Sequence, residues 1–100
     1  MPDIRLSFPY RLSQDEAGSR VKRLLGDLQD SYGNRIRDLR EEWKGNSCSF
    51  SFQVSGFRVS GTITTTPKSV DLTGKLPWAA AVFKSQIEDA IRRRAETLLA

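Results

Sequence analysis

The chain has 100 residues, of which 38% are hydrophobic and 28% charged, and its formal net charge is +4. This composition is typical of a soluble globular protein with one modest core, and it excludes a disordered chain. With no histidine and a single cysteine, Cys48, the chain cannot form an internal disulfide, a Cys–His or Ser–His–Asp nucleophile system, or a zinc site of the usual Cys/His type.

A strand and a helix are predicted at the start of the chain. Apolar and polar residues alternate from Ile4 to Phe8, which predicts a half-buried strand. Ser13 and Glu16 have the spacing of a capping box, where a helix begins. The apolar residues that follow fall within one arc about 100° wide, and Gly33 supplies a left-handed end. We therefore expect one helix that reaches Tyr32.

Four consecutive strands are predicted next. Helical and strand spacing are both present from Ile36 to Trp43, and we favour a strand from about Asp38 to Lys44. Gly45-Asn46 and Ser55-Gly56 are two-residue hairpin turns, and a longer turn contains Pro67. All three turns keep the apolar residues on one face of the sheet, as a meander requires. They predict the pairs Trp43–Cys48, Val54–Phe57 and Ile63–Val70.

The opposite face of this meander carries mainly serine, threonine and glutamine. We expect it to be a solvated sheet face. The alternative is a face that packs on a second subunit, so a homodimer stays open.

The last element is a long helix. Pro77 suits a first helical turn, and the helix is expected to run to about Leu98. The predicted order of strand, helix, four strands and helix indicates a single α+β domain over residues 1–100. Its one antiparallel sheet would carry both helices on the apolar face, with the C-terminal helix across it. The helix side expected against the sheet comprises Ala79, Ala80, Phe83, Ile87, Ala90, Ile91 and Leu98.

Two apolar residues do not fit this side of the helix. Trp78 and Val82 point away from it and, four residues apart, can touch each other. We favour a strand-to-helix corner that covers them; the alternative is an exposed apolar patch for a partner or an apolar particle. The candidate residues for such binding are Leu76, Trp78 and Val82.

Charged residues give weaker signals. Arg94 falls within the apolar side, where we expect its stem to lie on the core and its head to reach water; the alternative is a cation at the mouth of a pocket. Glu41 shares strand parity with Trp43, and we expect an edge position for it. The run Arg92–Arg94 points in three directions along a helix and is better explained as a solvated helix end than as a nucleic-acid site. No phosphate loop or dinucleotide fingerprint appears, so no catalytic residue, metal or cofactor is predicted.

The expected location is cytoplasmic. The chain start lacks the apolar run of a signal peptide. The longest apolar stretch, Leu76 to Phe83, is far short of the roughly 20 residues that span a bilayer. The mild positive charge permits an anionic partner without predicting one.

Several short motifs, taken in order, carry a family resemblance. They are Tyr32-Gly33, Glu42-Trp43-Lys44-Gly45-Asn46, Phe50-Ser51-Phe52, Gly56-Phe57-Arg58-Val59-Ser60-Gly61-Thr62 and Gly74-Lys75-Leu76-Pro77. In this order the chain resembles the polyhydroxyalkanoic acid system family, also called the polyhydroxyalkanoate granule-region family. The resemblance implies a small bacterial protein associated with polyhydroxyalkanoate (PHA) storage genes, at the granule surface. It transfers no enzymatic activity and no catalytic residues.

Two hypotheses of function follow. The first is a non-enzymatic accessory module that binds the PHA granule or a granule-associated protein. The second is a carrier of a small acyl or lipid ligand, by analogy with helix-grip folds. Its pocket would lie between helix and sheet and would be lined by Phe50, Phe52, Val59, Leu72, Phe83 and Arg94.

Overall fold

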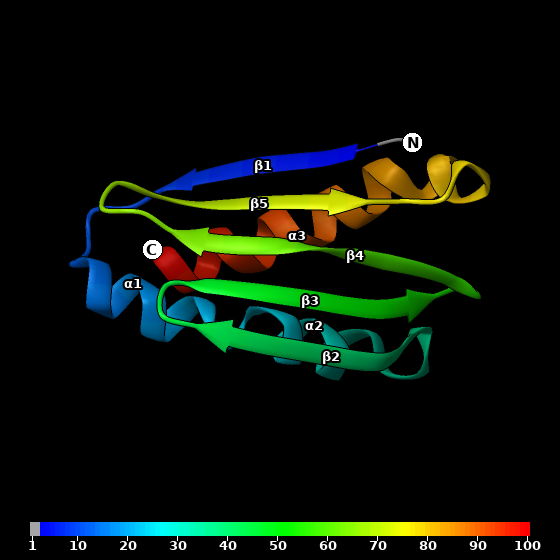
Figure 1. Cartoon of the computed structure of the whole chain (residues 1–100), viewed down its shortest axis with the longest axis horizontal. Helices are drawn as coiled ribbons and strands as arrows, with labels where there is room; N and C mark the ends of the chain where they lie inside the picture. The colour runs from blue at the N-terminus through cyan, green and yellow to red at the C-terminus, as the bar shows by residue number, and fades with distance from the viewer. Residues whose placement is uncertain (1–2) are drawn as a thin grey trace.

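The apolar residues that alternate along the strands all face one side of an antiparallel sheet. A computed structural model describes residues 3–100, which form five strands and three α-helices (Figure 1). The spatial order of the strands is β1-β5-β4-β3-β2. β1 therefore forms one edge of the sheet, beside β5, and β2 forms the other edge. The strands are β1 (Asp3–Pro9), β2 (Ile36–Lys44), β3 (Ser47–Val54), β4 (Phe57–Thr65) and β5 (Ser69–Lys75). The helices are α1 (Gln14–Val21), α2 (Leu24–Tyr32) and α3 (Lys84–Leu99), with 3₁₀ helices η1 (Gly33–Arg35) and η2 (Trp78–Phe83).

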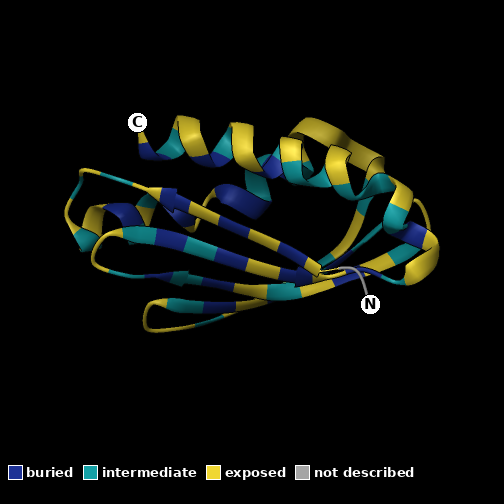
Figure 2. Cartoon of the chain, turned by 90° about the horizontal axis from the view of Figure 1, so that it is seen from above, coloured by how far each residue is buried: buried dark blue, intermediate teal, exposed yellow. Residues whose placement is uncertain are grey.

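The helices form a second layer on one face of the sheet, which confirms the predicted α+β architecture. α2 packs against β2, and α3 packs against β1 and against both other helices. Seen from above, α3 turns its buried residues toward the sheet and its exposed residues away (Figure 2). The fully buried side chains are largest at Ile4, Leu24, Ile63, Leu72 and Leu76, so strands and helices share one core.

The hairpin pairing follows the predicted turns with one correction. Trp43 pairs with Cys48 and Val54 pairs with Phe57, as predicted. The predicted pair Ile63–Val70 is wrong, because Val70 pairs with Thr65 and Ile63 pairs with Leu72. The two strands therefore stay paired up to Thr65 and Val70, and the turn between them is shorter than predicted. The Thr66 hydroxyl stabilises this short turn by accepting the backbone N–H of Ser69 at 3.0 Å. The shift is by two residues, so the same side chains stay on the buried face.

The first predicted helix is divided in two. Its start is confirmed, because the Ser13 hydroxyl accepts the backbone N–H of Glu16 at 3.1 Å. Its end is confirmed too, since Gly33 has a φ of 56°. Between them the helix is interrupted at Lys22 and Arg23, and α1 and α2 are separate. Apolar periodicity continues across this break, which is why the pattern alone predicted one helix.

The last predicted helix also differs in its first turns. Residues Trp78–Phe83 form the 3₁₀ helix η2, and the α-helix begins only at Lys84. A 3₁₀ helix has three residues per turn, so side chains point in other directions than in an α-helix. Ala80 is buried as predicted, whereas Ala79, predicted in the core, is exposed.

The outer strand β2 is irregular. Its register against β3 shifts between Arg37 and Arg40, and Asp38 has a φ of 54°. The Asp38 carboxylate accepts hydrogen bonds from Arg58 at 2.8 Å and from Arg40 at 3.2 Å. These hydrogen bonds, first that from Arg58, hold the pKa of Asp38 below its usual value. The charged network therefore stabilises a backbone conformation with positive φ, which residues other than glycine rarely adopt.

Candidate functional site

The first candidate site is a small apolar patch on η2. Trp78 is 72% exposed and Val82 79% exposed, and both are more exposed than any other large apolar residue among residues 3–100. The expectation that the strand-to-helix corner covers them is therefore wrong. Ala79 beside Trp78 is also exposed, and Lys75 and Lys84 flank the segment. We call Trp78, Ala79 and Val82 the η2 patch.

Leu76, the third residue proposed for surface binding, lies apart from this patch. It follows β5 directly and is fully buried in the core. A buried side chain offers no surface to a partner unless the protein opens. The structure thus separates Leu76, which anchors the end of β5, from Trp78 and Val82, which project into solvent.

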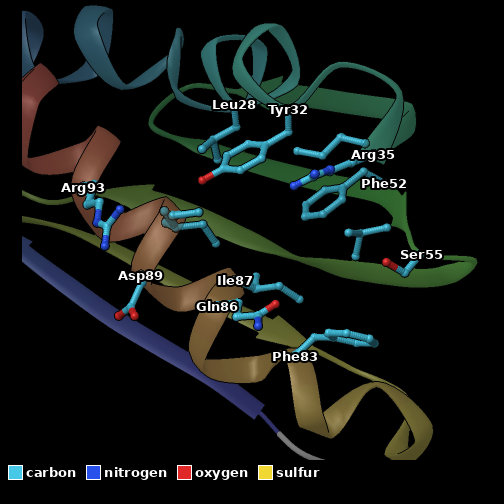
Figure 3. Close-up of a pocket in the computed structure, with 14 residues that line it drawn as sticks. Leu28, Tyr32, Arg35, Phe52, Ser55, Phe83, Gln86, Ile87, Asp89 and Arg93 are labelled. Atoms are coloured by element: carbon cyan, nitrogen blue, oxygen red, sulfur yellow. The ribbon is translucent and has the colours of Figure 1, made fainter.

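The second candidate site is a cleft between the helical segments that cover one face of the sheet. It has a volume of about 620 Å³ and lies where α2 and η1 face η2 and the first half of α3 (Figure 3). This volume falls within the range of small-molecule sites. The apolar residues that line the cleft are Leu28, Tyr32, Ile36, Phe52, Val54, Phe83, Ile87, Ala90 and Ile91.

The cleft exists because α3 is buried unevenly along its length. Its C-terminal half buries Ile91, Ala95 and Leu99. In the N-terminal half and η2, Phe83, Ile87 and Ala90 are only half-buried, although the sequence placed them on the core side. These three side chains form one wall of the cleft.

The ring of Phe83 is positioned by an aromatic contact with the sheet. Its ring packs against that of Phe57 at the start of β4, with the centroids 6.2 Å apart and the planes at 43°. Such tilted contacts favour a fixed ring orientation. The aromatic wall of the cleft is therefore positioned by the β3–β4 hairpin, whose Ser55 also lines the opening.

The rim of the cleft carries charged and polar side chains. Arg35 comes from η1, and Gln86, Asp89 and Arg93 come from α3. Asp89 forms an ion pair with Arg92 at 3.4 Å, so its charge is offset outside the cleft. Within residues 3–100, no carboxylate lies within 4.0 Å of the guanidinium of Arg35 or Arg93. The rim is therefore cationic.

The six residues predicted to line a pocket divide between cleft and core. Phe52 and Phe83 line the cleft. Phe50, Val59 and Leu72 are buried in the core, and Phe50 stacks on Phe52 with centroids 6.0 Å apart. Arg94 lines a smaller neighbouring hollow and donates to the Ser31 hydroxyl at 3.4 Å, so it joins α3 to α2.

Sequence reasoning missed the opposite wall of the cleft. Tyr32 and Arg35 lie at the end of α2 and in η1, and Ile36 begins β2. In the sequence, Ile36 belongs to a stretch with both helical and strand spacing, so its role in the cleft is not indicated there. The available signal was Tyr32 directly before the helix-ending Gly33 and Ile36 three residues after it.

Neither site contains an evident reactive group. Cys48 is buried away from the cleft, and burial, with the nearby charge of Glu41, raises the pKa of its thiol. Residues 3–100 contain no group of three or more Cys, Asp or Glu side chains arranged to hold a metal ion. No helix in this part of the chain is long and apolar enough to cross a bilayer.

The fold defines a small α+β protein with one antiparallel sheet, helices on one face, an apolar cleft and an exposed apolar patch. Within that class, residues 4–99 match the model of the family described as "Putative polyhydroxyalkanoic acid system protein". Because the match covers nearly the whole chain, the protein belongs to this family, and the predicted resemblance is confirmed. The description names no reaction. Searches of curated proteins and of solved structures gave no significant match.

Proposed function

We propose that the protein is a non-enzymatic accessory module that attaches to the PHA granule through the η2 patch. Two observations support this. The family is a PHA system family, and Trp78 and Val82 are exposed to an extent that folding alone does not explain. Large apolar side chains on a short segment between lysines suit a surface that is apolar with a polar boundary.

The patch sets an upper limit on binding strength. Burying one large apolar side chain completely contributes roughly 1.5–3 kcal/mol, so Trp78 and Val82 together give a few kcal/mol. A single copy would bind reversibly with low affinity. Retention on a granule would then depend on many copies on one surface or on a second, granule-associated protein as partner.

A granule co-sedimentation assay tests this proposal. The double variant Trp78→Ala, Val82→Ser should be lost from isolated granules, because it removes the apolar contact area. Its unfolding midpoint should stay close to that of the wild type, since both side chains are mostly exposed.

The matched control is Trp78→Phe, which keeps a large apolar ring at the same position and should remain on the granules. Equal recovery of the wild type and the double variant would refute attachment through η2. Recovery of wild type from a mock preparation without polymer would show that sedimentation reflects aggregation, which also counts against the proposal.

A second candidate function is carriage of a small acyl or lipid ligand. The observation that favours it is the cleft, whose volume and apolar lining suit such a molecule. Native mass spectrometry of protein purified from cells tests it. A reproducible added mass of an acyl species supports a carrier, and a bare protein mass under all conditions argues against one.

A further inference from the structure

We propose that the cleft binds an amphipathic monocarboxylate, with its hydrocarbon tail along the apolar walls and its carboxylate at the rim that carries Arg35 and Arg93. This inference rests on the second candidate function and adds the chemical class of the ligand and the residues that select it. It depends on one juxtaposition: an apolar cleft of about 620 Å³ bordered by two arginines without acidic partners.

The tail site is formed by two facing walls. Phe52 of β3 lies on one side, and Phe83 and Ile87 lie on the other (Figure 3). Phe83 and Ile87 are half-buried, so each keeps apolar surface in contact with water. A hydrocarbon chain that entered the cleft would remove this apolar surface from water. The chain itself has no polar group that would lose hydration on burial.

The head-group site follows from the charges on the rim. Arg35 extends from η1 toward the inside of the cleft, on the side of Tyr32 and Phe52 (Figure 3). Arg93 approaches from α3. The one acidic residue of the rim, Asp89, is paired with Arg92. A guanidinium beside an apolar surface is well suited to a carboxylate, since it offers two parallel N–H donors and remains charged.

The same geometry disfavours other occupants. A neutral lipid would gain nothing from the two guanidinium groups, which are exposed and stay hydrated when it binds. A polyphosphate needs more donors than two side chains on opposite walls, and no glycine-rich phosphate loop is present in the sequence. An anion with one charge and one apolar body matches both features of the cleft.

A displacement assay tests the inference. The probe is a dansyl-labelled undecanoate, displaced by decanoate below its critical micelle concentration or by decan-1-ol below its limit of solubility in water. We expect decanoate to displace the probe at least about fivefold more strongly than decan-1-ol. Arg35→Gln and Arg93→Gln should each weaken decanoate about fivefold or more and leave decan-1-ol unchanged, because only the charged head contacts them.

Two further variants complete the design. Arg11→Gln is the control, because Arg11 is exposed, has no salt bridge among residues 3–100 and does not line the cleft; it should bind as the wild type does. Ala90→Phe should fill the cleft and reduce the binding of acid and alcohol alike.

The outcomes separate the two levels of the hypothesis. Equal displacement by acid and alcohol, blocked by Ala90→Phe, would overturn the carboxylate site and leave ligand carriage standing. Absence of displacement by either compound would overturn both. A concentration-dependent dimer that excludes the probe would show that a second copy occupies the cleft, and this would overturn the inference as well.

Discussion

Gly61 of β4 lies directly opposite Gly74 of β5, and the two strands approach so closely there that Gly61 has no room for a side chain. A Cβ atom on Gly61 would overlap the carbonyl oxygen of Thr73, which is backbone and cannot move aside independently. It would also come within 2.9 Å of the Phe50 ring. The glycine therefore allows the central strands to pair and Phe50 to cover them.

Gly61→Ala should destabilise the protein by about 1–3 kcal/mol, the usual cost of forcing an extra atom into a packed site. Urea unfolding measured by circular dichroism provides the test. The control is Gly18→Ala in α1, where a Cβ meets nothing within 4 Å; it should be neutral or stabilising by up to about 1 kcal/mol. If the two variants had equal midpoints, the close approach of β4 and β5 would be contradicted.

Asp38→Asn should make the protein less stable at neutral pH and almost equally stable in acid. The hydrogen bonds from Arg58 and Arg40 lower the pKa of Asp38 in the folded protein, so the unfolded chain takes up a proton first as pH falls. The stabilisation by the ionised carboxylate is complete above the ordinary aspartate pKa, near pH 4, and is lost as pH falls through the lower folded value. Asparagine tolerates the positive φ, so the variant mainly removes the charge.

Urea midpoints of wild type and Asp38→Asn between pH 2 and pH 7 check this. The gap between them should be widest at pH 7 and should close toward the acid end. Asp30→Asn is the control, since Asp30 is exposed on α2 and forms no salt bridge within residues 3–100; it should show a smaller gap. A gap that grew toward acid would have the opposite sign and would exclude the proposed cause.

Cys48 should resist thiol reagents while the protein is folded. The side chain is buried, and burial raises the pKa of the thiol, so the reactive thiolate is scarce. Reaction with Ellman's reagent should be at least about a hundredfold slower in buffer than in denaturant, because it waits for transient opening.

The double variant Cys48→Ala, Ser49→Cys is the matched control. Position 49 is the next residue of β3 and is exposed on the other face of the sheet. A cysteine there should react rapidly in the folded state. Rapid reaction of wild-type Cys48 would show that β3 has the opposite orientation from that described.

The strands were more predictable than the helices because short turns set the pairing of neighbouring strands locally, whereas apolar spacing alone does not show where a helix is interrupted. A two-residue turn such as Ser55-Gly56 sets the register locally, and Val54 pairs with Phe57 accordingly. The break at Lys22 and Arg23 leaves the apolar period intact, so it could not be detected. The 3₁₀ helix η2 begins directly after Pro77, and a helical wheel, which assumes α-helical spacing, does not describe it.

The candidate site was only partly predictable for a similar reason. Phe52 and Phe83 were identified as apolar residues on facing elements, and both line the cleft. Periodicity shows which face of an element is apolar, but not whether the facing element fills the space in front of it. Phe50 and Phe52 have the same strand pattern, yet only Phe52 borders the opening. The contribution of Arg35 depends on the short η1 turn, which has no apolar period.

The irregular course of β2 at Asp38 has a consequence when many copies are crowded together. A straight edge strand presents an unbroken row of unpaired backbone groups, on which a neighbouring chain can add itself and start aggregation. The shift between Arg37 and Arg40 interrupts that row. Glu41 lies opposite Phe50 and so places a carboxylate on the inward side of the same strand. Copies of the protein at high local concentration would consequently not join edge to edge through β2.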